Sequence, residues 1–100
     1  MVKPHNRLRE CTGFEWDDGN LTKNWEQHDV SEAECEQAFF NRPLIARRDT
    51  RHSETEARFY VLGRTDAGRL LFVAFTIRQD RVRVISARDM TPAERQRHQR

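Results

Sequence analysis

The stretch RFYVLGRTDAGRLLFVAFTIRQDRVRVISAR, residues 58–88, decides the fold. It holds three runs of apolar, β-branched and aromatic residues, at 58–64, 69–78 and 81–88, and such runs are typical of β-strands. The turn-forming sequences TDAG and QD separate the runs. Connections this short join antiparallel neighbours, so the stretch predicts a curved antiparallel sheet.

Two further elements precede this sheet. The sequence LIARR at 44–48 continues the strand pattern and predicts a fourth strand, which a polar loop joins to the others. Before it, Ser31 and Glu34 have the spacing of a capping box that begins a helix, and Asn41 and Pro43 end that helix. We expect this helix to cover the sheet.

Helices are also predicted nearer both ends of the chain. One apolar stripe predicts a helix over 19–28, and the alternating residues at 14–16 predict a short strand or the lead-in to that helix. Thr91 and Glu94 form a second capping box, which begins a C-terminal helix. Two N-terminal helices, a curved antiparallel sheet and a C-terminal helix make an α+β fold.

The length of 100 residues fits one small domain. Residues 1–12 are polar and aperiodic, so we expect a flexible leader there and a single domain over 13–100. No run approaches the roughly 18 apolar residues of a membrane span, and the first residues lack the apolar centre of a signal peptide. These features predict a cytoplasmic protein that makes no membrane contact.

Charge is unevenly distributed along the chain. Residues 1–46 hold five Lys and Arg and nine Asp and Glu, a net charge of −4, whereas residues 47–100 hold thirteen and seven, a net charge of +6. All thirteen later cations are Arg, whose planar fork of donors suits phosphate, so the second half favours contact with nucleic acid. The alternative is that these Arg residues pair with nearby carboxylates, namely Glu54, Glu56, Asp66, Asp80 and Glu94.

Alternation along the strands gathers polar side chains on one face of the sheet. The residues concerned are Arg58, Tyr60, Arg64, Thr76, Arg78, Ser86 and Arg88. Strict alternation puts Val82 and Val84 on the same side of their strand as Ser86, and Arg83 on the other side. We expect this face to bind a phosphate backbone, with Tyr60 stacking on a base and Arg83 as a further RNA contact. The alternative for Tyr60 is a half-buried residue of the sheet.

The sequence predicts no metal site and no cofactor. Cys11 and Cys35 lack the spacing of metal ligands and are expected to be free thiols. The four His residues are scattered, and the four Gly residues form no phosphate-binding loop.

Several stretches, in order, resemble the BrnT family of ribonuclease toxins. Those similar to the opening of the family are FEWD at 14–17, Asn24, HDVS at 28–31 and EQAF at 36–39. Those similar to its middle and end are RFYVLGRT at 58–65, GRLL at 68–71, FTIR at 75–78, VISAR at 84–88 and TPAER at 91–95. The ordered set, which spans residues 14–98, is more specific than any single stretch.

The resemblance implies a metal-independent endoribonuclease toxin of a type II toxin–antitoxin pair, with a RelE-like fold, that cleaves RNA and arrests translation. It also implies a BrnA-like ribbon-helix-helix antitoxin as partner, with DNA contacted only through that antitoxin. From the residues alone, a non-catalytic module that binds RNA or a partner, and a small structural subunit, stay open as alternatives.

The chain departs from the family's usual residues at three positions. Gln27 stands where the family usually has Lys, which removes a cation that could contact RNA. Asp29 stands where the family has Gly. His98 stands where a Tyr is common in the last helix, and it is a second group able to transfer protons.

RNA cleavage without a metal needs proton transfer and stabilisation of developing charge. The candidates for charge stabilisation are Arg58, Arg64, Arg78 and Arg88. His28 is the leading candidate for proton transfer, with His98 second; the alternative for His28 is a residue that only ends a helix. We expect the last helix to be loosely docked in the free protein, because almost no apolar residue follows Ala93.

Overall fold

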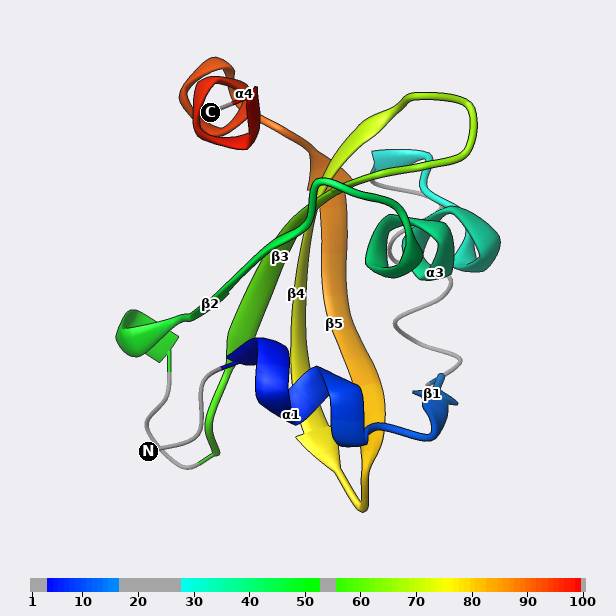
Figure 1. The fold of residues 1–100 in the computed structure, drawn as a ribbon, viewed down its shortest axis with the longest axis vertical. Coiled ribbons are helices and arrows are strands. Elements are labelled where there is room, and N and C mark those ends of the chain that lie inside the picture. Colours follow the sequence, from blue (N-terminus) through cyan, green and yellow to red (C-terminus); the bar gives the residue numbers. More distant parts are fainter. Residues whose placement is uncertain (1–3, 17–27, 53–55, 100) are drawn as a thin grey trace.

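The computed structural model of the chain describes residues 4–16, 28–52 and 56–99 (Figure 1). The fold is α+β, with helices on a five-stranded sheet of order β1-β5-β4-β3-β2. The strands are β1 (Gly13–Glu15), β2 (Ile45–Arg48), β3 (Phe59–Arg64), β4 (Leu70–Arg78) and β5 (Arg81–Asp89). The helices are α1 (Pro4–Glu10), α3 (Glu32–Phe40), the short 3-10 helix η1 (Thr50–His52) and α4 (Pro92–Gln99).

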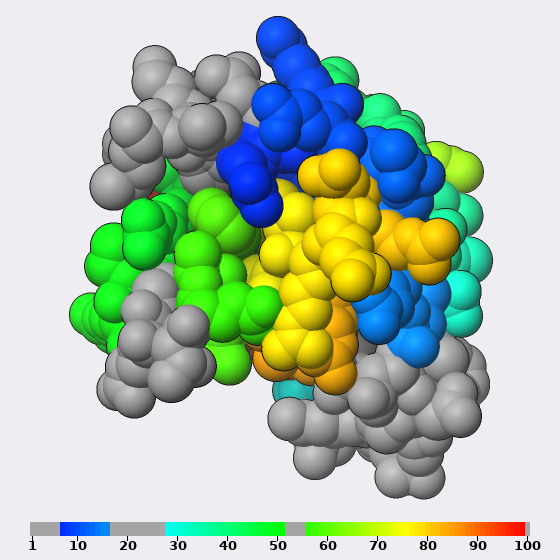
Figure 2. Space-filling view, turned by 90° about the horizontal axis from the view of Figure 1, so that it is seen from below, coloured from blue at the N-terminus to red at the C-terminus, as the bar shows by residue number. Residues whose placement is uncertain are grey.

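The antiparallel meander is confirmed. β2 pairs with β3, β3 with β4 and β4 with β5, each in antiparallel register. Gln79 and Asp80 both have positive φ, the conformation of a tight hairpin turn, and Gly68 has φ of 92° in the preceding turn. Seen from below, the β4–β5 turn (yellow) lies between the N-terminal segment (blue) and the β2–β3 segment (green) (Figure 2).

The prediction of a wholly antiparallel sheet is wrong at one edge. β1 pairs with β5 in parallel, with Phe14 opposite Val82, and the backbone N–H of Thr12 donates to Asp80 at 2.7 Å. A three-residue strand of this kind carries no local signal of its direction. The chain brings it beside β5 because Phe14 is partly buried against the core.

Helix α3 begins and packs as its sequence predicts. The Ser31 side chain caps the N–H of Glu34, and the Glu34 carboxylate accepts from the N–H of Ser31, which completes the capping box. Ala38 and Phe39 are buried, and α3 lies so close to β3 that a side chain at Gly63 would collide with the backbone carbonyl of Ala38. α3 therefore covers one face of the sheet, which we call the core face.

A β-bulge changes which residues of β5 share a face. Ser86 lies opposite Ala74 and Val84 opposite Phe75, so Ile85 is the extra residue. Val82 and Val84 therefore lie on the core face, and Arg83 lies opposite Thr76 on the other face. The strict alternation that we predicted for 81–88 is wrong in this respect.

Helices lie near both ends of the described chain. Pro4–Glu10 form α1, and Leu8 and Cys11 pack partly buried against the core. The flexible leader over 1–12 and the division of the chain at residue 12 stay predictions. Helix α4 is docked rather than loose, since His98 is only 4% exposed. The expected helix over 19–28 lies outside the described residues except for its last position.

No described helix is long and apolar enough to cross a membrane. The core is formed by the apolar residues of the core face together with α3; its largest fully buried side chains include Phe75, Leu71, Val61 and Val73. This packing fixes the position of the opposite face, on which the candidate site lies.

Candidate functional site

The face of the sheet opposite α3 carries most of the residues that the sequence predicts as a site, and we call it the arginine face. Its members are Arg58, Tyr60, Arg64, Phe72, Thr76, Arg78, Arg83, Ser86 and Arg88. Cross-strand partners share a face, and the register pairs Phe72 with Arg88 and Thr76 with Arg83. The bulge in β5 thus brings Arg83 to the same face as Arg88, contrary to the sequence prediction.

The end of the arginine face near the start of β4, which we call the upper end, carries an aromatic pair that lies between two guanidinium groups. The rings of Tyr60 and Phe72 stack with centroids 5.1 Å apart. The guanidinium carbon of Arg88 lies 4.1 Å from the Phe72 centroid, and that of Arg97 lies 5.6 Å from the Tyr60 centroid. Arg97 also donates to the Tyr60 hydroxyl at 2.7 Å. A base could stack on Tyr60 only where Arg97 leaves room.

Arg88 is also bound by the helix that follows it. Its two terminal nitrogens donate to the two carboxylate oxygens of Glu94, at 2.8 and 3.1 Å. Burial raises the pKa of Glu94, but hydrogen bonds from Arg88 and Thr91 outweigh burial, so the pKa lies below its usual range. The carboxylate occupies the same fork of donors that a phosphate would use.

The lower end of the arginine face holds a second paired arginine. Arg78 donates to both carboxylate oxygens of Glu56, at 2.8 and 3.1 Å, and these hydrogen bonds hold the pKa of Glu56 below its usual range. Nearby, Thr76 is 5% exposed, and its hydroxyl has no hydrogen-bond partner in the part of the chain described. The predicted alternative, in which Arg pairs with carboxylates, therefore holds at Glu56 and Glu94.

The predicted arginines do not converge on one point. Arg78 lies six residue steps along β4 from Phe72, which is beside Arg88, and at about 3.3 Å per step these ends lie about 20 Å apart. Arg64 ends β3 near the upper end, is exposed, and has no ion pair with a carboxylate among the described residues. A ligand that touches both ends must be extended, as a nucleic-acid strand is.

His28 lies apart from the arginine face. Its carbonyl accepts from Arg69 at 3.0 Å, and its ring is close enough to Asp89 to help lower the pKa of that carboxyl, after the larger effect of a hydrogen bond from Arg69. Asp89 points to the core face, whereas its neighbour Arg88 points to the arginine face. His28 therefore lies at the upper edge of the sheet, and none of its described contacts reaches the four candidate arginines.

The other predicted proton-transfer group, His98, is buried. Its Nε2 lies 2.8 Å from the carbonyl oxygen of Pro43, so Nε2 carries the proton and donates it. This contact anchors α4 to the segment before β2. His98 thus has a packing role in this structure.

Sequence reasoning missed two residues of the site, Phe72 and Arg97. Alternation puts Phe72 on the correct face, but Phe72 has no polar group that would mark it as a site residue. Glu94 was expected as a helix cap and as one of the carboxylates that could pair with Arg; that its partner is Arg88 depends on how α4 folds back over the sheet. Among the described residues, no three His, Cys, Asp or Glu side chains lie together as a metal-ligand cluster.

Comparison with known proteins identifies the family. The sequence profile described as "Ribonuclease toxin, BrnT, of type II toxin-antitoxin system" matches residues 16–94. The chain belongs to the BrnT family. It is thus a member of a family of ribonuclease toxins, and the resemblance noted in the sequence is confirmed. No curated protein matches the chain.

A solved BrnT structure has a similar fold. The crystal structure of the Brucella abortus ribonuclease toxin BrnT, at 1.1 Å resolution, matches with a TM-score of 0.57 and 18% sequence identity. The match covers 79% of this chain and 96% of that chain. Asp29, one of the three departures noted in the sequence, adopts a φ of 58°. Gly favours this region, and Asp is among the few other residues that tolerate it.

Proposed function

We propose that this BrnT-family chain is a metal-independent endoribonuclease that cleaves RNA on the arginine face and thereby arrests translation. The observation that carries the proposal is the upper end of that face, where Arg88 lies over the Phe72 ring and its bidentate fork binds an anionic group, the carboxylate of Glu94. The family supports a ribonuclease role in general; the arginine face supplies a surface of matching charge.

Cleavage of the RNA needs three catalytic functions. The 2′-oxygen loses its proton and attacks the adjacent phosphorus, the pentavalent phosphorane bears extra negative charge, and the departing 5′-oxygen takes up a proton. The products are a 2′,3′-cyclic phosphate and a 5′-hydroxyl. Fixed guanidinium groups stabilise the charge of the phosphorane, and this is commonly the largest contribution to the rate.

We assign these functions to particular residues. Arg88 and Arg64, at the upper end, stabilise the phosphorane. His28 lies apart from the arginine face at the upper edge of the sheet, and its assignment to proton transfer rests on the sequence alone. Because the lower end lies about 20 Å away by strand rise, its residues bind the flanking RNA rather than the reacting phosphate. The residues that we assign to flanking RNA are Arg58, Arg78, Arg83, Ser86 and Thr76, whose hydroxyl is buried in the free chain. Tyr60, at the upper end, is assigned the stacking of a base.

The partner that fits this role is a BrnA-like ribbon-helix-helix antitoxin, which would also make the only link to DNA. The bond between Arg88 and Glu94 supports an acidic partner, because in this ion pair a carboxylate on a helix binds the guanidinium that we assign to phosphate. We further propose a RelE-like arrangement of the fold and a cytoplasmic location, where RNA and the antitoxin are both present.

The experiment is incubation of the purified chain with a 5′-labelled RNA, with and without a chelator. We expect cleavage that persists in the chelator, produces cyclic phosphate ends, and fails on a strand with 2′-deoxy sugars. Cleavage that the chelator abolishes would disprove metal independence. Binding without cleavage would favour the alternative, a non-catalytic RNA-binding module. The Arg88→Ala variant, purified in parallel, controls for contaminating nucleases.

A further inference from the structure

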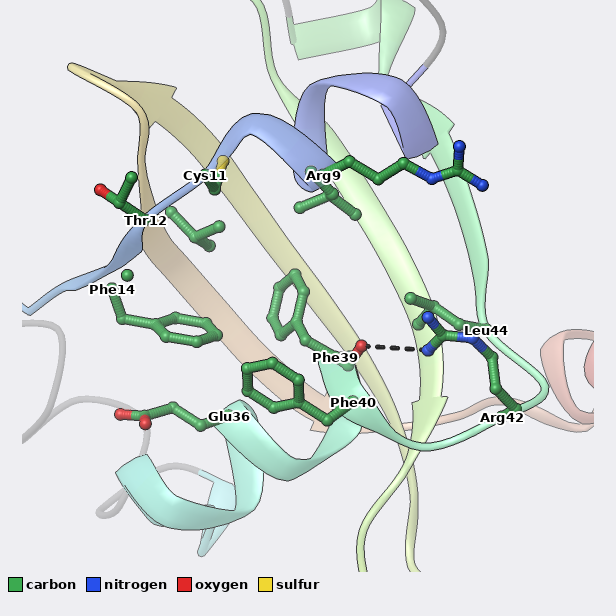
Figure 3. A pocket seen from close by; sticks show the side chains of 12 residues that line it. Arg9, Cys11, Thr12, Phe14, Glu36, Phe39, Phe40, Arg42 and Leu44 are labelled. Atoms are coloured by element: carbon green, nitrogen blue, oxygen red, sulfur yellow. Dashed lines mark hydrogen bonds between the residues drawn. The ribbon is translucent and has the colours of Figure 1, made fainter.

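The other side of the sheet holds a pocket that the proposed RNA chemistry does not use. It has a volume of about 620 Å³ and lies between α1, β1 and the C-terminal end of α3 (Figure 3). Its apolar walls are Leu8, Phe14, Phe39, Phe40, Leu44 and Val82. The volume is typical of sites for small organic molecules.

Three phenylalanine rings form the centre of this pocket. Phe14 meets Phe39 edge to face, with centroids 5.2 Å apart, and meets Phe40 in a similar way at 6.1 Å. Phe40 is 72% exposed and is the one large hydrophobic side chain that is strongly exposed among the described residues. Its ring therefore presents an unused apolar surface beside a hollow, which an apolar ligand would cover.

The charged side chains around the pocket are separated by sign. Figure 3 shows Arg9 and Arg42 on one side and Glu36 on the opposite side. Glu36 accepts a hydrogen bond from the Trp16 indole at 2.9 Å. Arg42 donates to the backbone carbonyl of Phe39 at the long distance of 3.4 Å. Within the described part of the chain, no carboxylate pairs with Arg9 or Arg42.

We propose that this pocket binds a small organic anion that has an apolar, preferably aromatic, body and one carboxylate. The body packs against the three phenylalanines, and the carboxylate is bound on the side of the pocket that Arg42 and Arg9 line. Arginine donors and a carboxylate match in charge and in geometry. A neutral ligand of the same shape fills the apolar space but leaves the two arginines without an anion.

Cys11 supplies a built-in reporter of occupancy. Cys11 lines the pocket and is partly exposed, whereas Cys35 is fully buried and burial raises the pKa of its thiol to about 12. Alkylation of the folded protein therefore takes place at Cys11. Burial also raises the pKa of Cys11, so less of its thiol is ionised and its alkylation is slower than that of a free thiol.

The probes are 2-naphthoate and its neutral isostere 2-naphthamide, titrated while iodoacetamide alkylates Cys11. We expect 2-naphthoate to slow the alkylation and to bind about tenfold more tightly than the amide, since a charge-assisted hydrogen bond to Arg stabilises only the acid. Equal affinity for the two probes, or no protection by millimolar naphthoate, would overturn the proposal.

Matched variants locate the effect. Arg9→Gln with Arg42→Gln should reduce the affinity for naphthoate to that for the amide, and Phe40→Ala should weaken both probes. Arg51→Gln, a change at an exposed arginine of η1 outside the pocket, should change neither. An unchanged preference for naphthoate in the double variant would place the anion elsewhere and disprove the site. RNA cleavage, which we assign to the opposite face, should survive all of these changes.

Discussion

Helices α3 and α4 begin with the same device and are then held in place in different ways. In each, a hydroxyl residue and a glutamate three positions later form a capping box, Ser31 with Glu34 and Thr91 with Glu94. In each, the glutamate also binds an arginine: Arg69, which directly precedes β4, in the first case and Arg88 of β5 in the second. The local sequence signal is thus nearly identical.

The difference lies in what the rest of each helix contacts. α3 buries Cys35, Ala38 and Phe39 in the core, whereas His98 is the buried residue of α4 among those described. α3 is therefore held by apolar packing, and α4 is held by a few polar contacts on the arginine face. Because polar contacts hold α4, its docking is sensitive to charge. An anion that binds Arg88 would displace Glu94 from it and so weaken one contact of α4.

Arg69 and Arg88, which bind the two capping glutamates, also differ in their surroundings. Arg69 is surrounded by protein acceptors: the carboxylates of Glu34 and Asp89 and the carbonyls of His28 and Asp29. Its place is structural. Arg88 has one carboxylate partner and lies across an aromatic ring on the face where we place RNA. The comparison teaches that the same pairing fixes the fold at one position and prepares a binding group at the other.

The largest effect should come from the apolar anchor of α3. Phe39→Ala should lower the free energy of unfolding by about 3 to 5 kcal/mol, because a large core side chain is lost and a cavity remains. Urea denaturation measures this. Phe40→Ala is the matched control: that ring is 72% exposed, so its loss should cost less than about 0.5 kcal/mol. Equal losses would mean that α3 is not held by its buried face.

The anchor of α4 should matter less to stability. His98→Ala removes a hydrogen bond to Pro43 and some packing, so we expect a loss of about 1 to 2 kcal/mol in the free energy of unfolding. Hydrogen exchange should show faster exchange in α4 and unchanged protection in α3. A loss of protection in both helices would show that α4 is part of the core after all.

The capping glutamates should make both helices sensitive to pH. Hydrogen bonding to Ser31 lowers the pKa of Glu34, and hydrogen bonds from Arg88 and Thr91 overcome burial to lower that of Glu94. A carboxyl whose pKa is lower in the folded state stabilises the fold above its ordinary value of 4.5 and loses this effect as the pH falls through the lower value.

Glu34→Gln and Glu94→Gln should therefore each lower the free energy of unfolding at pH 7, by an amount on the order of 1 kcal/mol. The difference from the parent chain should be smaller at pH 3 than at pH 7. Denaturant titrations at the two pH values check this. A deficit that is the same at both would indicate that the charge of the glutamate contributes nothing.

Local chemistry explains what could be predicted from the sequence. The capping boxes, the strands and the turn at Gln79 are encoded by residues a few positions apart, and these predictions are confirmed. The bulge at Ile85 could not be predicted, because alternation gives no sign of where a strand gains a residue. The parallel pairing of Phe14 with Val82 joins segments far apart in sequence, and only tertiary packing decides it.

The sequence predicted which residues lie on the arginine face, but it did not predict how they pair with one another. Alternation placed Tyr60, Arg78 and Arg88 on one face correctly, since each strand keeps its own periodicity. Which carboxylate each arginine binds depends on α4 folding back and on the chain before β3, and the sequence contains no local signal for either. The roles of these residues in RNA cleavage stay predictions.

The most direct test of the account compares RNA cleavage by Arg88→Ala and Arg69→Ala, each checked by circular dichroism to be folded under the assay conditions. We predict that Arg88→Ala lowers the cleavage rate about 100- to 1,000-fold, since a donor to transition-state charge is lost, and that Arg69→Ala lowers stability while its folded fraction cleaves at nearly the parent rate. Glu94→Ala, which breaks the same ion pair but keeps Arg88, should retain cleavage. Full activity of Arg88→Ala, or an equal loss in Arg88→Ala and Glu94→Ala, would contradict the claim that Arg88 acts on the RNA.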